Sequence, residues 1–271
     1  MTKRLAIIAG KGLLPLDVAL AARRDGYEVF IFPIIGQSDA IFDGFAVVPI
    51  RLGAIASVRA AILDSGVKQL VMVGKVDWPS LSALRPDFDG VKLLGRMITK
   101  GDDGALRLIK SYFMEKGIDI LGVDLFLRDR KMPIGVISGP APTAKESAII
   151  AQAVSVLSAL GSHDVGQSIV AQNGRILAIE AAEGTDAMLT RCHGLIHASD
   201  GIACFVKMAK SHQERNLDTP VIGCKTIEVA AKAGIGLVAA EAGKVLLADE
   251  LERLGATCEQ LNVRKIGRAH V

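Results

Sequence analysis

The chain of 271 residues is 50% hydrophobic and 23% charged, which suits a folded globular protein and excludes a mainly disordered one. Its net charge of +3 gives no electrostatic reason to expect a nucleic-acid partner. Aromatic residues make up 4% and glycine occupies 28 positions, so we expect a core of Ala, Val, Ile and Leu in helices packed on a parallel sheet.

The first half of the chain alternates short apolar runs with segments of helical periodicity. This alternation predicts βαβ units and a parallel sheet, so residues 1–131 are expected to form a Rossmann-like α/β domain. Residues 80–90 follow Pro79, hold Pro86 and three charged residues, and are expected to form a loop. The expected strands are residues 5–9, 28–35, 70–74 and 118–123, and the expected helices are residues 16–24, 54–63 and 103–116.

A change in composition marks a domain boundary near the middle of the chain. Residues 128–142 pass from charged residues to Pro133, Pro140 and Pro142, which a helix or a central strand would not tolerate. We therefore expect a linker at residues 132–143 and a second, mixed α/β domain at residues 144–264. Its expected helices are residues 145–160 and 226–233, and its expected strands are residues 168–172, 175–180, 202–208 and 236–240.

The last seven residues, 265–271, match the translation of a common sequencing adapter, so we expect a non-native tail there. The longest apolar runs have the length of strands rather than of membrane spans. The four cysteines include no C-x-x-C pair, which favours a reduced, cytoplasmic protein.

A glycine-rich turn is expected between the first strand and the first helix. The glycines of Gly10-Lys11-Gly12 let the backbone approach a ligand closely, and free N–H groups at a helix start attract phosphate. An ordinary tight turn is the alternative. Pro15 stands where the dinucleotide-binding G-x-G-x-x-G pattern needs glycine, which argues against a nicotinamide-dependent oxidoreductase.

Carboxylates gather at two expected helix starts. Asp102 and Asp103 precede one helix, and Glu180, Glu183 and Asp186 surround another. Helix capping explains such residues in many proteins. The alternative is a Mg²⁺ or sugar site, because Mg²⁺ prefers hard oxygen ligands.

A polar segment, residues 207–220, begins at the end of the expected strand 202–208. It holds two lysines, an arginine and two carboxylates, which suit phosphate binding; a solvated charged loop is the alternative. Gln167 and Asn173 supply amides near the preceding hairpin, which suit a uracil edge or a sugar.

These motifs, taken in order, resemble the UDP-2,3-diacylglucosamine diphosphatases of the LpxI type, enzymes of lipid A biosynthesis in Gram-negative bacteria. The resemblance covers nearly the whole chain and is most specific over residues 167–189. It implies Mg²⁺-dependent hydrolysis of a UDP-linked diacylated glucosamine to UMP and the acylated sugar 1-phosphate, lipid X. It also implies two domains with the substrate between them, and a homodimer. The motifs are Gly10–Pro15, Gly101–Asp103, Val165–Arg175, Glu183–Leu189 and Gln213–Gly223.

The sequence departs from the family pattern at two places. Lys11 stands where the glycine turn is expected to carry glycine, and Glu214 replaces an aspartate. The longer Glu214 side chain moves its oxygens by about one bond, so Glu214 is expected to support Asp218 rather than to replace it.

The residues and the resemblance agree on phosphoryl transfer to water. We expect Asp218, supported by Glu214, to bind Mg²⁺ or to orient the attacking water, and Asp186 to act with them. Lys207 is expected to offset developing negative charge. The other expected substrate-binding residues are Gly10, Lys11, Gly12, Lys75, Asp103, Gln167, Asn173 and Thr185.

Two further expectations remain open. A non-catalytic nucleotide-binding regulatory or carrier protein is the alternative function, because the departures at Lys11 and Glu214 leave room for a decayed site. A diacylated substrate is amphiphilic, so we also expect an apolar part of the site or a loose contact with the membrane surface.

Overall fold

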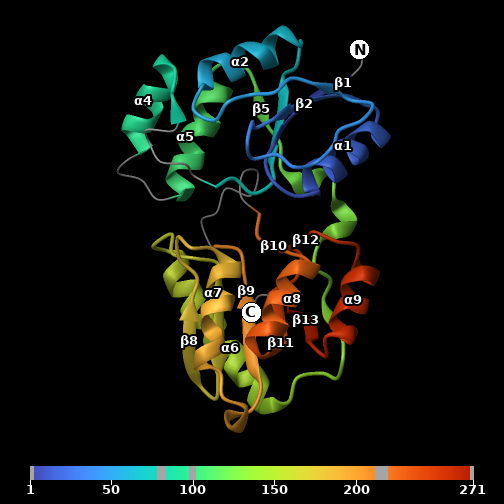
Figure 1. Cartoon of the computed structure of the whole chain (residues 1–271), viewed down its shortest axis with the longest axis vertical. Coiled ribbons are helices and arrows are strands. Elements are labelled where there is room, and N and C mark those ends of the chain that lie inside the picture. Colours follow the sequence, from blue (N-terminus) through green and yellow to red (C-terminus); the bar gives the residue numbers. More distant parts are fainter. Residues whose placement is uncertain (1–2, 78–83, 98–101, 211–218, 269–271) are drawn as a thin grey trace. The chain divides into compact units, whose positions relative to one another are not determined.

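The computed structural model describes residues 3–77, 84–97, 102–210 and 219–268, except for the side chains of residues 102 and 103. The chain forms two compact units that divide between Arg128 and Asp129 (Figure 1). Each unit is built on its own sheet. Within the described residues, no helix combines the length and the apolar character that a membrane crossing requires.

The first unit contains a five-stranded parallel sheet with the order β3-β2-β1-β4-β5. This order reverses between β1 and β4, as in a doubly wound nucleotide-binding fold, and it confirms the predicted Rossmann-like sheet. The expected strand at residues 118–123 is shorter than predicted, because a 3-10 turn, Val123–Leu125, follows it. The strands are β1 (Lys3–Ala9), β2 (Tyr27–Pro33), β3 (Ala46–Val47), β4 (Gln69–Val73) and β5 (Asp119–Ile120).

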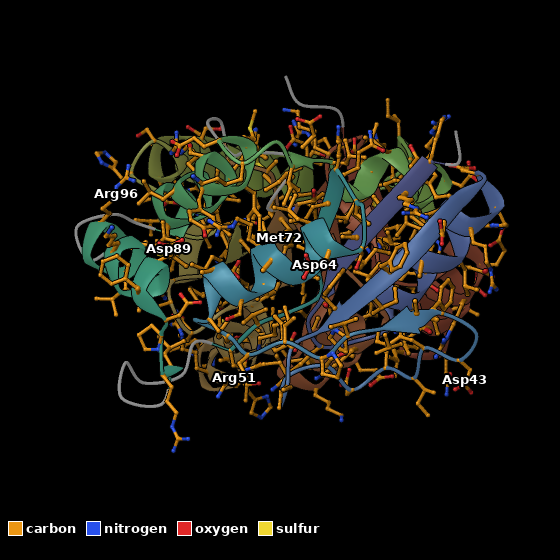
Figure 2. All side chains as sticks on the ribbon, turned by 90° about the horizontal axis from the view of Figure 1, so that it is seen from above. Asp43, Arg51, Asp64, Met72, Asp89 and Arg96 are labelled. Carbon is orange, nitrogen blue, oxygen red and sulfur yellow. The ribbon has the colours of Figure 1, made fainter. Side chains whose placement is uncertain are left out.

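Helices pack against this sheet on both faces. α1 (Leu14–Arg24) packs against β1 and β2 and buries Val18, Ala19 and Ala22. α2 (Ile55–Asp64) and α5 (Asp102–Met114) share a second core with the sheet through Ile62, Leu70 and Phe113. Figure 2 shows α2, which ends at Asp64, lying over the strand that carries Met72.

α4 (Phe88–Met97) begins inside the segment that the sequence predicts as a loop. Asp87 is the cause, because its carboxylate accepts a hydrogen bond of 2.9 Å from the backbone N–H of Gly90 and so caps the helix start. The predicted loop therefore ends at Asp87 rather than at Gly90. α4 packs against α2 and α5.

The second unit contains a six-stranded mixed sheet with the order β6-β13-β11-β9-β7-β8. β9, β11 and β13 run parallel, whereas β6 and β7 run antiparallel to their neighbours. The hairpin predicted around Asn173 joins β7 to β8, which confirms a mixed α/β architecture. The strands are β6 (Gly135–Ser138), β7 (Ser168–Gln172), β8 (Arg175–Ile179), β9 (Ala203–Lys207), β11 (Ile235–Glu241) and β13 (Arg264–Arg268), and β10 (Val221–Ile222) pairs separately with β12 (Leu246–Leu247).

Two separate cores cover the faces of this sheet. α6 (Ala144–Gly161) packs on one face through Ile150, Ala153 and Leu157. The other core joins Leu189, Ile227 and Leu254 from three helices. Those helices are α7 (Thr185–Cys192), α8 (Cys224–Ala233) and α9 (Leu251–Gln260), and short 3-10 turns lie at Arg128–Arg130, His193–Leu195 and Ala198–Asp200.

Two segments set apart by the sequence belong to this second unit. Residues 132–143, expected as a linker, contain the edge strand β6 between Pro133 and Pro140, and edge strands tolerate neighbouring prolines. Residues 265–268 of the expected non-native tail form most of β13, which lies between β6 and β11.

Candidate functional site

Four polar residues of the second unit meet where β8 and β9 end, and we call them the edge cluster: Ser168, Glu180, Thr185 and Lys207. The Lys207 ammonium donates a hydrogen bond of 2.7 Å to the Thr185 hydroxyl oxygen. That hydroxyl donates in turn to Glu180 over 2.8 Å, and the Ser168 hydroxyl donates to the same carboxylate. The carboxylate thus holds the threonine that positions the lysine.

The strand register and two glycines bring these residues together. Antiparallel pairing of β7 with β9 places Ser168 opposite Lys207. Gly184, with φ of +80°, precedes α7 and so places Thr185 in its first turn. Gly166 has φ of +52°, and a Cβ there would lie 1.9 Å from the Glu180 carbonyl oxygen. Only glycine allows this close approach of residue 166 to Glu180.

The surroundings of the edge cluster favour binding of an anion. Lys207 is only 6% exposed, so its charge is weakly screened by water. The start of α7 adds a partial positive charge, because the first N–H groups of a helix have no acceptor within the helix itself. A rigidly held ammonium beside a helix start is suited to a phosphate oxygen whose negative charge grows during reaction.

A buried carboxylate shapes the backbone beyond Lys207. Glu241, at the end of β11, accepts a hydrogen bond of 3.0 Å from the backbone N–H of Ala209 and pairs with Lys244 over 2.6 Å. The N–H of Met208 donates to the Gln167 carbonyl over 2.9 Å. These contacts fix the path of the chain as it leaves β9.

Replacing Gly166 with alanine is expected to lower the unfolding free energy by about 2–4 kcal/mol, because the new methyl group collides with backbone and the φ value is unfavourable. Gly174 is a matched control, since its φ is +76° but a Cβ there would meet nothing within 4 Å. Gly174→Ala should cost only about 1 kcal/mol, for the backbone conformation alone. Chemical denaturation measures both, and equal losses would contradict the steric explanation.

The first unit carries a second polar group, which we call the turn cluster: Lys11, Asp39, Lys75 and Asp77. Lys11 and Lys75 form an isolated antiparallel bridge, with N···O distances of 2.8 and 3.2 Å. The side-chain ammonium groups of both lysines pair with the Asp77 carboxylate, and Nζ of Lys75 lies 3.6 Å from Oδ1 of Asp77. The hydrogen bond from Lys11 holds the pKa of Asp77 below its ordinary value.

Close backbone contact closes the crevice between β1 and β4, where doubly wound folds place a dinucleotide. A Cβ on Gly10 would lie 2.6 Å from the Lys75 carbonyl oxygen, and one on Gly74 would lie 2.8 Å from that of Lys11. The Asp39 carboxylate accepts a hydrogen bond of 2.7 Å from the Gly12 N–H, which a phosphate would otherwise use. This turn is therefore not built like a nicotinamide-binding turn.

The structure brings many of the predicted site residues into these two groups. Gly10, Lys11, Gly12 and Lys75 lie together in the first unit. In the second unit Thr185 and Lys207 lie in the edge cluster, and the Gln167 N–H lies 3.4 Å from Glu180. Asp186 follows Thr185 in α7, and its carboxylate lies 3.9 Å from the Lys225 ammonium.

Other predicted residues lie elsewhere. Asn173, with φ of +51°, forms the turn after β7, at the opposite end of that strand from Ser168. Asp103 lies in the first turn of α5, and its side chain is outside the described part of the structure. Asp218 and Glu214 are also outside the described residues. The part of the chain that is described contains no group of three His, Cys, Asp or Glu side chains placed to hold a metal ion.

Sequence reasoning missed Asp39 and Asp77 of the turn cluster, and it included Glu180 only as part of an acidic segment. Asp39 and Asp77 each follow shortly after a buried strand of the first sheet, and Glu180 directly follows β8. Their signal in the sequence is a polar residue just past an apolar run, since the carboxyl ends of parallel strands share one edge of a sheet.

Comparisons with known proteins agree with this arrangement in two domains. Residues 4–130 match the family model of the LpxI N-terminal domain, and residues 133–264 match that of the LpxI C-terminal domain. A protein of Caulobacter vibrioides named UDP-2,3-diacylglucosamine pyrophosphatase LpxI is 32% identical over 98% of this chain and 97% of its own length. The chain belongs to the LpxI family.

Two solved structures are only distantly similar to the chain. A glycinamide-RNase-transformylase T of Mycobacterium tuberculosis is 15% identical over 66% of this chain and 44% of its own, with a TM-score of 0.26. A putative epimerase of Burkholderia cenocepacia is 11% identical over 99% of this chain and 84% of its own, with a TM-score of 0.30. TM-scores this low support no inference about fold or function.

Proposed function

We propose that this protein hydrolyses the pyrophosphate bond of UDP-2,3-diacylglucosamine, releasing UMP and 2,3-diacylglucosamine 1-phosphate. The observation that carries the proposal is the 32% identity to the Caulobacter pyrophosphatase over 98% of the chain. The edge cluster supports it, because a buried ammonium held beside a helix start suits a pyrophosphate substrate.

In the proposed reaction the oxygen of a water molecule bonds to one phosphorus of the pyrophosphate, and the bond from that phosphorus to the bridging oxygen breaks. One water proton is released, and both products leave as phosphomonoesters. Lys207 offsets the negative charge that grows on the phosphate oxygens. The Thr185 hydroxyl, which is itself held by Glu180, keeps the Lys207 ammonium in place through a hydrogen bond of 2.7 Å. Pre-arrangement of this kind lowers the reorganisation needed in the transition state.

The direct test is incubation of the purified protein with the dispersed lipid substrate, followed by mass spectrometry of both products. Equal amounts of UMP and the acylated sugar 1-phosphate are expected. The alternative function, a non-catalytic nucleotide-binding or carrier protein, has no observation in its favour. It would bind UMP or the substrate without turnover, and that result would reject the proposed function.

Mg²⁺ dependence is part of the proposal, with Asp218 and Glu214 as the residues that would hold the ion. When bound, Mg²⁺ neutralises phosphate charge and polarises phosphorus–oxygen bonds. The support is chemical, since carboxylates are the ligands this ion prefers. Chelation by EDTA should abolish turnover and added Mg²⁺ should restore it, whereas Asp218→Ala should stay inactive in excess Mg²⁺. Persistent hydrolysis in the chelator would contradict the metal requirement.

The cellular setting is also a proposal: a cytoplasmic homodimer that meets the membrane surface loosely. Its support is the set of four free, buried cysteines, which suits a reducing compartment, and the amphiphilic substrate of the relative. Analytical ultracentrifugation measures the oligomeric state directly.

A further inference from the structure

We infer that α4 of the first unit docks the protein on an anionic membrane surface through its outward face. This inference rests on the proposed function, because a diacylated substrate resides in a lipid bilayer. We define the outward face by Phe88, Val91, Lys92 and Arg96, which recur at the spacing of one helix side. Phe88 is 73% exposed and Val91 is 56% exposed, so α4 presents large apolar side chains to solvent.

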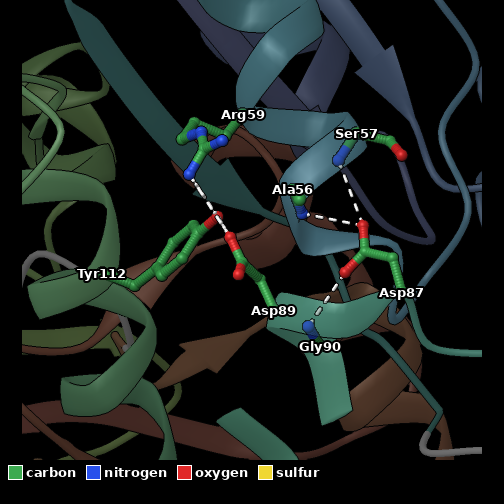
Figure 3. Close-up of polar contacts among 7 residues, drawn as sticks. All are labelled: Ala56, Ser57, Arg59, Asp87, Asp89, Gly90 and Tyr112. Atoms are coloured by element: carbon green, nitrogen blue, oxygen red, sulfur yellow. Dashed lines mark hydrogen bonds and ion pairs between the residues drawn. The ribbon is translucent and has the colours of Figure 1, made fainter. Parts of the chain in front are cut away.

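Hydrogen bonds on the inner side of α4 fix this orientation (Figure 3). The Asp89 carboxylate accepts from the Tyr112 hydroxyl over 2.7 Å and from the Arg59 guanidinium over 3.3 Å. The Asp87 carboxylate accepts from the backbone N–H groups of Ala56 and Ser57, over 2.9 and 3.1 Å.

The arrangement departs from the usual pattern of a surface helix, although Leu93 of α4 is buried in the ordinary way. Both carboxylates are turned toward α2 and α5, whereas the phenylalanine and valine face outward. α4 cannot rotate to hide its apolar side without breaking these hydrogen bonds. In Figure 2, Asp89 lies on the inner side of α4 and Arg96 projects away from the ribbon.

The charges on the outward face identify its partner as an anionic surface. The exposed residues of α4 include Lys92 and Arg96 but no carboxylate. The Lys92 ammonium lies 4.2 Å from the centre of the Phe88 ring. The cation and the aromatic ring are therefore neighbours on the same exposed face of α4. Apolar side chains that enter the acyl boundary while lysine and arginine stay at the headgroups are typical of interfacial helices.

The test measures binding of the full chain to vesicles of phosphatidylglycerol and phosphatidylcholine, with pure phosphatidylcholine as the neutral reference. The double variant Phe88→Glu, Val91→Glu should bind the anionic vesicles about 10-fold or more weakly than the unchanged protein. Lys92→Glu, Arg96→Glu should lose a similar factor, and salt should weaken the unchanged protein's binding. Ile134→Glu is the matched control, because Ile134 is 77% exposed but belongs to the second unit, and its binding should be unchanged.

Hydrolysis assays keep this inference separate from the proposed function. With detergent-dispersed substrate, the double variant should match the unchanged protein, and with vesicle-embedded substrate it should be about 10-fold slower. If neither the unchanged protein nor the double variant hydrolyses the dispersed substrate, the proposed function is wrong. The vesicle-binding measurements would still test whether α4 docks on the membrane. Vesicle binding unaffected by the α4 variants would overturn the inference. So would a change of oligomeric state in ultracentrifugation without loss of vesicle binding, since the face would then join copies of the chain.

Discussion

Replacing Lys207 with methionine is expected to lower kcat/KM for hydrolysis by about 100- to 1,000-fold, the range seen when one charge-stabilising donor is removed. Methionine keeps the apolar stem but has no ammonium group. Most of the loss should appear in kcat, because the ammonium is proposed to act on charge that grows in the transition state. Steady-state kinetics with detergent-dispersed substrate measure this change.

Two comparison variants separate the proposed role of Lys207 from a structural one. Lys232→Met removes an exposed lysine of α8 and should keep normal kinetics. Thr185→Val removes the hydroxyl that bonds both Lys207 and Glu180, so it should lower kcat less than loss of the ammonium does. Circular dichroism and thermal unfolding check that each variant is folded. A folded Lys207→Met protein with normal kcat/KM would contradict the role given to the edge cluster.

Replacing Lys265 with methionine is expected to raise the unfolding free energy at pH 7 by about 3 kcal/mol. The Lys265 side chain in β13 is fully buried, and its ammonium has no hydrogen-bond partner among the described residues. Burial lowers the pKa of this lysine from 10.5 to about 8. That difference corresponds to the stated free energy at about 1.4 kcal/mol per pH unit, and methionine fills a similar volume without charge.

The stability gained by Lys265→Met should depend on pH in a defined direction. Below pH 8 the lysine is protonated in both the folded and the unfolded chain, so its full destabilising effect is present. Between pH 8 and 10.5 the unfolded chain binds more protons, and the protein with lysine therefore becomes more stable as the pH rises. Above pH 10.5 the two proteins should differ little in stability.

Denaturant unfolding of both proteins at several pH values, followed through the transition of the second unit, measures this dependence. Lys232→Met serves again as the control, because an exposed lysine should contribute almost nothing to stability. A gain that stays constant from pH 7 to pH 10.5, or no gain at all, would show that the buried ammonium is not the source of the instability.

The alternation of apolar runs and helical patterns was sufficient to predict the parallel sheet of the first unit and the hairpin of the second. Elements with a weak local signal were missed. α9 buries only Leu254 and Cys258, a stripe too narrow to recognise in the sequence. β6 lies between prolines, where the composition indicates a linker, and it forms only because β13 offers an edge for pairing.

The sequence predicts those residues of the candidate site that lie directly at the end of a strand or the start of a helix. Lys207 and Thr185 could be selected from their places at a strand end and a helix start. Glu180 was noticed only as part of an acidic segment, because its role depends on the register that brings Ser168 and Thr185 to it. Asn173 was grouped with Gln167 through proximity in sequence, but β7 separates the two.

By itself, then, the sequence determined the class of fold, the division into two α/β parts and the residue types available for phosphate chemistry. These properties are local, because the periods of strands and helices and the conformational needs of turns are written in neighbouring residues. Only the tertiary structure decided which polar groups meet, which face of α4 is exposed and that the Lys265 ammonium is buried. Those outcomes depend on strand order and register, which join residues far apart in the chain.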